Sequence, residues 1–195
     1  FFLILRRQEW SISMPSSSAS YLYKAYIYNV VNPGDSEAMN AFDFAIALTD
    51  ISESNFIANS NVKAYDITTL PGTEVTPVSV TSTLPTTVGT HDVTFASPSG
   101  KTSITAKAYV YNVVNSSDKE AINAHDFTIP LSLVNETNFI SYAEAKAYDI
   151  TTLPGVEVTP ISITSTLPTT TGTHNVTFAS PSGKTTITIQ VTVID

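Results

Sequence analysis

Short runs in which apolar and polar residues alternate recur along this chain, and they are typical of β-strands with one buried face. Phe42, Phe44, Ile46 and Leu48 alternate with smaller or polar residues in this way. Valine, isoleucine, tyrosine and threonine, which favour pleated surfaces, dominate the other runs. The pattern therefore predicts further strands at 21–31, 62–67, 75–83, 93–96 and 102–107.

Helix and turn signals separate these predicted strands. Residues 52–57 begin with a serine that can cap a helix, and they predict a short helix whose counterpart is 135–142. Residues 97–100 (Ser-Pro-Ser-Gly) predict a hairpin turn. Pro77 predicts an edge strand or a bulge, because proline cannot donate to a sheet.

The whole pattern occurs twice, at a spacing of 83 residues. Residues 25–107 and 108–190 align without a gap and are identical at 57 of 83 positions. Such a duplication predicts two domains of one fold. We predict an N-terminal tail or linker at 1–20, a first repeat at 21–107 and a second at 108–195.

Many short strands with little helix in each repeat indicate an all-β protein. We predict two tandem immunoglobulin-like antiparallel β-sandwiches, each with one short helix. No Gly, Pro or Ser linker separates the last strand of the first repeat from the first strand of the second. We therefore expect nearly continuous extended chain at 101–112, which would couple the two domains stiffly into a rod.

Charge and composition limit the classes of partner that we expect this protein to bind. The net charge of −8 argues against nucleic acid, which calls for a basic surface. No stretch is long and apolar enough to span a bilayer, so we expect no membrane insertion. The absence of cysteine excludes disulfides and thiol chemistry.

Several segments occur in an order that resembles the tandem Ig-like repeats of Gram-positive cell-wall-anchored surface adhesins. The resemblance covers both repeats, residues 25–195. It implies a non-catalytic, extracellular module at the cell surface, which would serve as a stalk and bind an unidentified protein or glycan. The segments in the first repeat are 40–44 (NAFDF), 63–66 (KAYD), 88–95 (VGTHDVTF) and 99–101 (SGK).

Enzyme activity is not expected. The sequence contains no nucleophile elbow, phosphate-binding loop or paired-carboxylate arrangement. A competing hypothesis is a filament subunit that joins its neighbour by strand donation. Its connector would be the apolar start of the chain, Phe1, Phe2, Leu3, Ile4 and Leu5.

The two repeats differ most around the predicted helix, where residues 45–62 and 128–145 share only 6 of 18 positions. This divergence has two explanations: neutral drift of a solvated face, or a surface on which each repeat meets its own partner. The residues of the candidate partner surface are Ser52, Glu53, Asn55, Asn135, Glu136 and Asn138.

No cofactor is expected, with calcium as the one alternative. Acidic side chains recur at equivalent positions in the two repeats, and calcium prefers such oxygen ligands. No dense D-x-D-x-D loop accompanies them, so solvated acids and turn caps remain the simpler interpretation. The recurring acids are Asp35, Glu37, Asp43, Asp66, Asp118, Glu120, Asp126 and Asp149.

Overall fold

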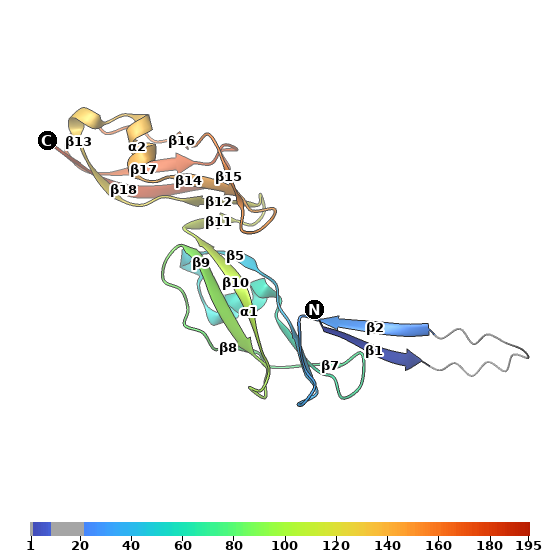
Figure 1. The fold of residues 1–195 in the computed structure, drawn as a ribbon. Helices are drawn as coiled ribbons and strands as arrows, with labels where there is room; N and C mark the ends of the chain where they lie inside the picture. Colours follow the sequence, from blue (N-terminus) through green and yellow to red (C-terminus); the bar gives the residue numbers. More distant parts are fainter. Residues whose placement is uncertain (1, 9–21) are drawn as a thin grey trace, which may run out of the picture. The chain divides into compact units, whose positions relative to one another are not determined.

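The computed structural model describes residues 2–8 and 22–195 and confirms an all-β protein with two sandwich-like halves (Figure 1). Contacts divide the chain into two compact units. The first comprises Phe1–Phe42, Phe56–Thr83 and Asp92–Ala106. The second comprises Asp43–Asn55, Leu84–His91 and Lys107–Asp195. The predicted boundary between the repeats, 107/108, lies inside one unbroken strand, β10 (Ser103–Tyr111).

Each repeat contributes two four-stranded sheets. In the first repeat one sheet has the order β3-β4-β6-β7 and the other β5-β10-β9-β8. The strands are β3 (Val30–Asn32), β4 (Glu37–Asn40), β5 (Phe44–Ala47), β6 (Lys63–Asp66), β7 (Thr73–Val75), β8 (Ser79–Val80) and β9 (Gly89–Ala96).

The second repeat has the same sheets, with orders β11-β12-β14-β15 and β13-β18-β17-β16. Its strands are β11 (Val113–Asn115), β12 (Glu120–Asn123), β13 (Phe127–Pro130), β14 (Lys146–Asp149), β15 (Val156–Val158), β16 (Ser162–Ile163), β17 (Gly172–Ala179) and β18 (Thr186–Ile194).

One strand pair in each repeat is parallel, so the sheets are not wholly antiparallel as predicted. β5 runs parallel to β10, with Phe44 opposite Ala108. β13 runs parallel to β18, with Phe127 opposite Val191. A parallel pair needs a long connection between its strands, and here most of the repeat separates them.

The predicted helices are present. A 3-10 turn, η1 (Leu48–Asp50), precedes α1 (Glu53–Ser60), and η2 (Leu131–Leu133) precedes α2 (Glu136–Tyr142). Phe56 and Phe139, one on each helix, are fully buried. Phe139 belongs to the core of the second repeat, together with Ile122, Ile129, Ala147, Val176, Phe178, Ile189, Val191 and Val193.

Some predicted strands differ from those observed. The predicted run 75–83 includes only the last residue of β7 and the two residues of β8; these short edge strands belong to different sheets, and Pro77 lies between them. β4 and β12 were not predicted. Phe42, expected on a buried face, lies before β5 with 58% of its surface exposed.

Two further strands form a separate ribbon at the N-terminal end. β1 (Phe2–Gln8) pairs antiparallel with β2 (Leu22–Tyr28), with Phe2 opposite Tyr28 and Gln8 opposite Leu22. The rest of the predicted tail, residues 1 and 9–20, lies outside the described residues. Across the described segments, the helices are all too short or too polar to cross a membrane.

Candidate functional site

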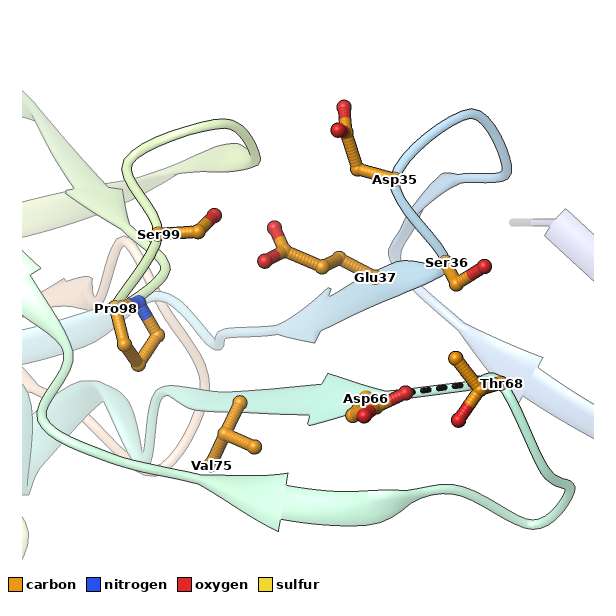
Figure 2. A pocket seen from close by; sticks show the side chains of 8 residues that line it. All are labelled: Asp35, Ser36, Glu37, Asp66, Thr68, Val75, Pro98 and Ser99. Carbon is orange, nitrogen blue, oxygen red and sulfur yellow. Dashed lines mark hydrogen bonds between the residues drawn. The ribbon is translucent and has the colours of Figure 1, made fainter.

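The described part of the first repeat contains a pocket of about 240 Å³ in which three carboxylates gather (Figure 2). We take it as the candidate site, because acids and hydroxyls meet there from segments far apart in the sequence. Its lining residues are Asp35, Ser36, Glu37, Asp66, Thr68, Val75, Pro98 and Ser99.

Sheet termini and turns bring these side chains together. Asp35 lies in the turn between β3 and β4, where Ser36 adopts a positive φ of 55°. Glu37 begins β4, and its neighbour across the sheet, Asp66, ends β6. Ser99 comes from the hairpin turn between β9 and β10, and Figure 2 shows Glu37 extending toward it.

Glu37 ties this hairpin turn to the opposite sheet. Its Oε2 accepts hydrogen bonds from Ser97 Oγ at 2.9 Å and from Thr102 Oγ1 at 2.7 Å. Burial alone would raise the pKa of Glu37. Hydrogen bonds from Ser99, Thr102 and Ser97 together outweigh it and lower the pKa below its usual 4.5. The carboxylate is thus held ionised by the protein's own hydroxyls, and we call this arrangement the carboxylate clasp.

The other two acids also have partners within the protein. Asp35 Oδ1 accepts a hydrogen bond from Lys101 Nζ at 2.8 Å, which lowers the pKa of Asp35. Asp66 Oδ1 accepts the backbone N–H of Thr68 at 2.8 Å, which lowers the pKa of Asp66. Each acid therefore has a partner within the protein and stabilises a loop.

The second repeat reproduces the clasp. Oε2 of Glu120 accepts hydrogen bonds from Ser180, Ser182 and Thr185, each at 2.8 Å. Asp118 binds Lys184 Nζ at 2.6 Å, as Asp35 binds Lys101. The main difference at the site is Lys119, which replaces Ser36. The bonds that hold the fold are therefore retained, while the surface charge beside them changes.

The acids proposed as calcium ligands do not form a donor set in this structure. Asp43 and Asp126 accept the backbone N–H groups of Lys107 and Gln190, both at 2.8 Å. Within residues 2–8 and 22–195, no three His, Asp or Glu side chains are grouped so that they could hold a metal ion. The calcium hypothesis therefore gains no support from the geometry.

Several of the candidate partner-surface residues make hydrogen bonds at the starts of the two helices. Ser52 Oγ accepts the N–H of Asn55 at 3.2 Å. Asn135 caps α2 by accepting the N–H of Asn138 at 2.9 Å, and Asn138 Nδ2 donates to the Leu133 carbonyl at 2.8 Å. The remaining two, Glu53 and Glu136, are exposed in the first turn of each helix, where a negative charge is favourable.

We predict that replacing Asn135 by Ala lowers the stability of the second repeat by about 0.5–2 kcal/mol, because an N-cap is lost. Thr137→Ala, an exposed change in the same turn, should stay within about 0.5 kcal/mol. Urea unfolding of both variants measures the difference. Equal stability of the two variants would contradict a stabilising role for the Asn135 cap.

The candidate connector residues lie partly within the described residues. Phe2, Leu3, Ile4 and Leu5 belong to β1, opposite Tyr28, Ile27, Tyr26 and Ala25 of the same chain. Phe1 lies outside the described residues. The connector segment therefore forms a strand, and its neighbour here is the chain's own β2.

A tyrosine latch, which the sequence did not reveal, fixes a loop in each repeat. The Tyr111 hydroxyl donates to the Pro154 carbonyl, and Tyr28 makes the same bond to Pro71. Burial raises the pKa of Tyr111 to about 12. The one signal in the sequence was the invariance of Lys63–Gly72 and Lys146–Gly155 between the repeats, which covers both loops.

The clasp predicts a loss of stability in acid. Because the pKa values of Glu37 and Glu120 are lowered on folding, their contribution is complete above the unfolded value of 4.5 and disappears as pH falls through the folded values. We expect the urea midpoint to fall over this range, and to fall less in the Glu37→Gln, Glu120→Gln double variant. Identical slopes in the two proteins would rule out the clasp as a contributor.

No protein-family model matches the chain, and no curated protein matches its sequence.

Proposed function

We propose that this chain is a non-catalytic, extracellular structural and adhesive repeat module that forms part of the stalk of a bacterial surface protein. The observation that carries the proposal is that both repeats retain the same stabilising contacts. The ion pair, the carboxylate clasp and the tyrosine latch occur at equivalent positions in both repeats. The helix surfaces, in contrast, diverged.

This pattern fits a spacer better than an enzyme. A spacer needs each copy to fold and tolerates change on its surface, whereas a catalytic site needs particular side chains kept available. In the candidate pocket, Asp35, Glu37 and Asp66 all bind groups of the protein itself. The resemblance to surface adhesin repeats supports the extracellular location, and duplication would supply length or avidity.

A display experiment tests the stalk proposal. A small binding domain is anchored to a cell surface directly, through one copy of this chain, or through two copies in tandem. We expect its access to antibody-coated beads to rise with the number of copies, and to be unaffected by alanine at Glu53 and Glu136. Access that does not depend on copy number would contradict the proposal.

The second candidate is a filament subunit joined through its N-terminal segment. The observation in its favour is that Phe2–Gln8 forms a strand, the conformation that strand donation requires. Negative-stain microscopy of the full chain and of a version that begins at Ser20 tests it. Fibres from the full chain alone would support this candidate, and monomers from both would remove it.

A further inference from the structure

The outer face of the sheet that contains β16, β17 and β18 in the second repeat is built from a regular set of polar side chains (Figure 1). Along β17 and β18 the side chains alternate, and Val176, Phe178, Ile189 and Val191 belong to the core. The residues between them therefore point outward. We call these residues, with one neighbour that follows β16, the hydroxyl face: Thr164, Thr173, Asn175, Thr177, Thr186, Thr188 and Gln190.

Strand register arranges these side chains as a grid. Asn175 lies opposite Gln190 and Thr177 opposite Thr188, whose hydroxyl oxygen is 2.8 Å from that of Thr177. Thr164 continues this row, because its backbone N–H donates to the Thr177 carbonyl at 2.9 Å. Neighbouring side chains are therefore about 4.8 Å apart across the strands and about 6.8 Å apart along them. Thr177 is partly exposed and the other members of the hydroxyl face are exposed, so a ligand can reach the whole grid.

The hydroxyl face is uncharged, although the chain carries a net charge of −8. Each threonine hydroxyl both donates and accepts hydrogen bonds, and the side-chain amides of Asn175 and Gln190 do the same. Threonine adds a methyl group, but the face contains no large apolar side chain. A ligand that matches this surface is therefore neutral and rich in groups that both donate and accept.

The first repeat places charges at the centre of the same face. Asp92 and Lys107 occupy the positions equivalent to Asn175 and Gln190, and both are exposed. Thr105, the equivalent of Thr188, is retained and exposed. These positions are thus exposed in the first repeat with the second repeat following it, so their exposure is a property of the fold. The second repeat differs in having lost charges of both signs from this surface.

We propose that the hydroxyl face of the second repeat binds a neutral polysaccharide. The amides of Asn175 and Gln190 and the surrounding threonine hydroxyls pair with sugar hydroxyls, which also both donate and accept. The threonine methyl groups pack against the C–H groups of the sugar rings. The grid extends about 14 Å along β18 and about 10 Å across the strands, which suits several linked sugar rings better than a single sugar.

Other classes of partner fit this face less well. A nucleic acid, an anionic glycan or a charged protein surface meets no opposite charge on it. A lipid or an apolar protein segment meets no large apolar side chain. A second copy of this chain presents the same neutral groups, and light scattering distinguishes that case in the experiment below.

The inference rests on the adhesive part of the proposed function and names its class of ligand. Because the display experiment measures reach and not binding, a failure of polysaccharide binding leaves the spacer role intact. Access that does not depend on copy number would in turn leave polysaccharide binding unaffected. The two experiments therefore fail separately.

Binding to insoluble neutral polysaccharides tests the proposal. The full chain is mixed with cellulose, chitin or insoluble β-1,3-glucan, and the bound fraction is measured against protein concentration. The Asn175→Asp, Gln190→Lys double variant carries the residues that the first repeat has at these positions, so we expect it to fold. We expect the parent chain to bind at least one of the three polysaccharides. The double variant should bind roughly tenfold more weakly, because its charges lose water against a neutral ligand.

Lys119→Ser is the matched control. It also brings a first-repeat residue into the second repeat, but in the turn between β11 and β12, and it should leave binding unchanged. Binding to none of the three polysaccharides, equal binding by the parent and the double variant, or an equal loss in Lys119→Ser would overturn the proposal. Tighter binding to alginate, an anionic polysaccharide, would overturn it too. So would a dimer, measured by light scattering, that the double variant abolishes, because it would assign the face to a second copy.

Discussion

Replacing Phe139 by Ala is expected to destabilise the second repeat by about 3–5 kcal/mol, the usual cost of removing a buried aromatic ring. The Phe139 side chain is fully buried, and its ring meets the Phe127 ring edge-on at 5.1 Å between centroids. The loss combines the burial of the ring with the cavity that its removal leaves. Urea unfolding with separate probes on the two repeats would measure it.

Tyr142→Ala provides the matched control on the same helix. Tyr142 also contacts the Phe127 ring, at 5.9 Å, but 42% of its surface is exposed. We expect this change to cost about 1 kcal/mol, the scale of one aromatic pair. Similar losses for the two variants would mean that α2 does not insert Phe139 into the core.

Replacing Gly155 by Ala is expected to cost about 2–5 kcal/mol, from a strained backbone together with a steric clash. Gly155 has a φ of +98°, a conformation that L-residues rarely adopt, and an added Cβ would lie 2.8 Å from the Tyr111 hydroxyl. The change therefore acts on the tyrosine latch. A thermal or urea melt gives the size of the effect.

Two companion variants separate the causes. Gly183 has a φ of +73°, and a Cβ added there would meet no other atom within 4 Å, so Gly183→Ala should show only the backbone cost, about 1–2 kcal/mol. Tyr111→Phe removes the clashing oxygen and should cost less in the Gly155→Ala background than in the parent. Equal costs for Gly155→Ala and Gly183→Ala would disprove the latch geometry.

Much of the architecture could be predicted from the sequence because it depends on local patterns. The helix at α1 followed from a capping serine, and the hairpin turn at 97–100 from its proline and glycine. The parallel pairing of β5 with β10 could not be predicted. Its register depends on contacts between residues about 64 positions apart in the sequence, and no local pattern encodes them.

The candidate site was only partly predictable, for a similar reason. The recurrence of Asp35, Glu37 and Asp66 was visible in the sequence, but it suggested calcium ligands, or solvated acids and turn caps. The structure shows that Glu37 binds hydroxyls 60 and 65 residues away. Serine and threonine are abundant everywhere in this chain, so their particular role near 97–102 carried no distinguishing signal.

Mechanical unfolding of the intact chain between its two ends tests most directly whether the protein is a structural module of two independently folded repeats. The account predicts two separate unfolding events. Each should release a contour length of about 300 Å, since 83 residues extend by roughly 3.6 Å each. A single event of twice that length, or smooth extension at low force, would contradict it.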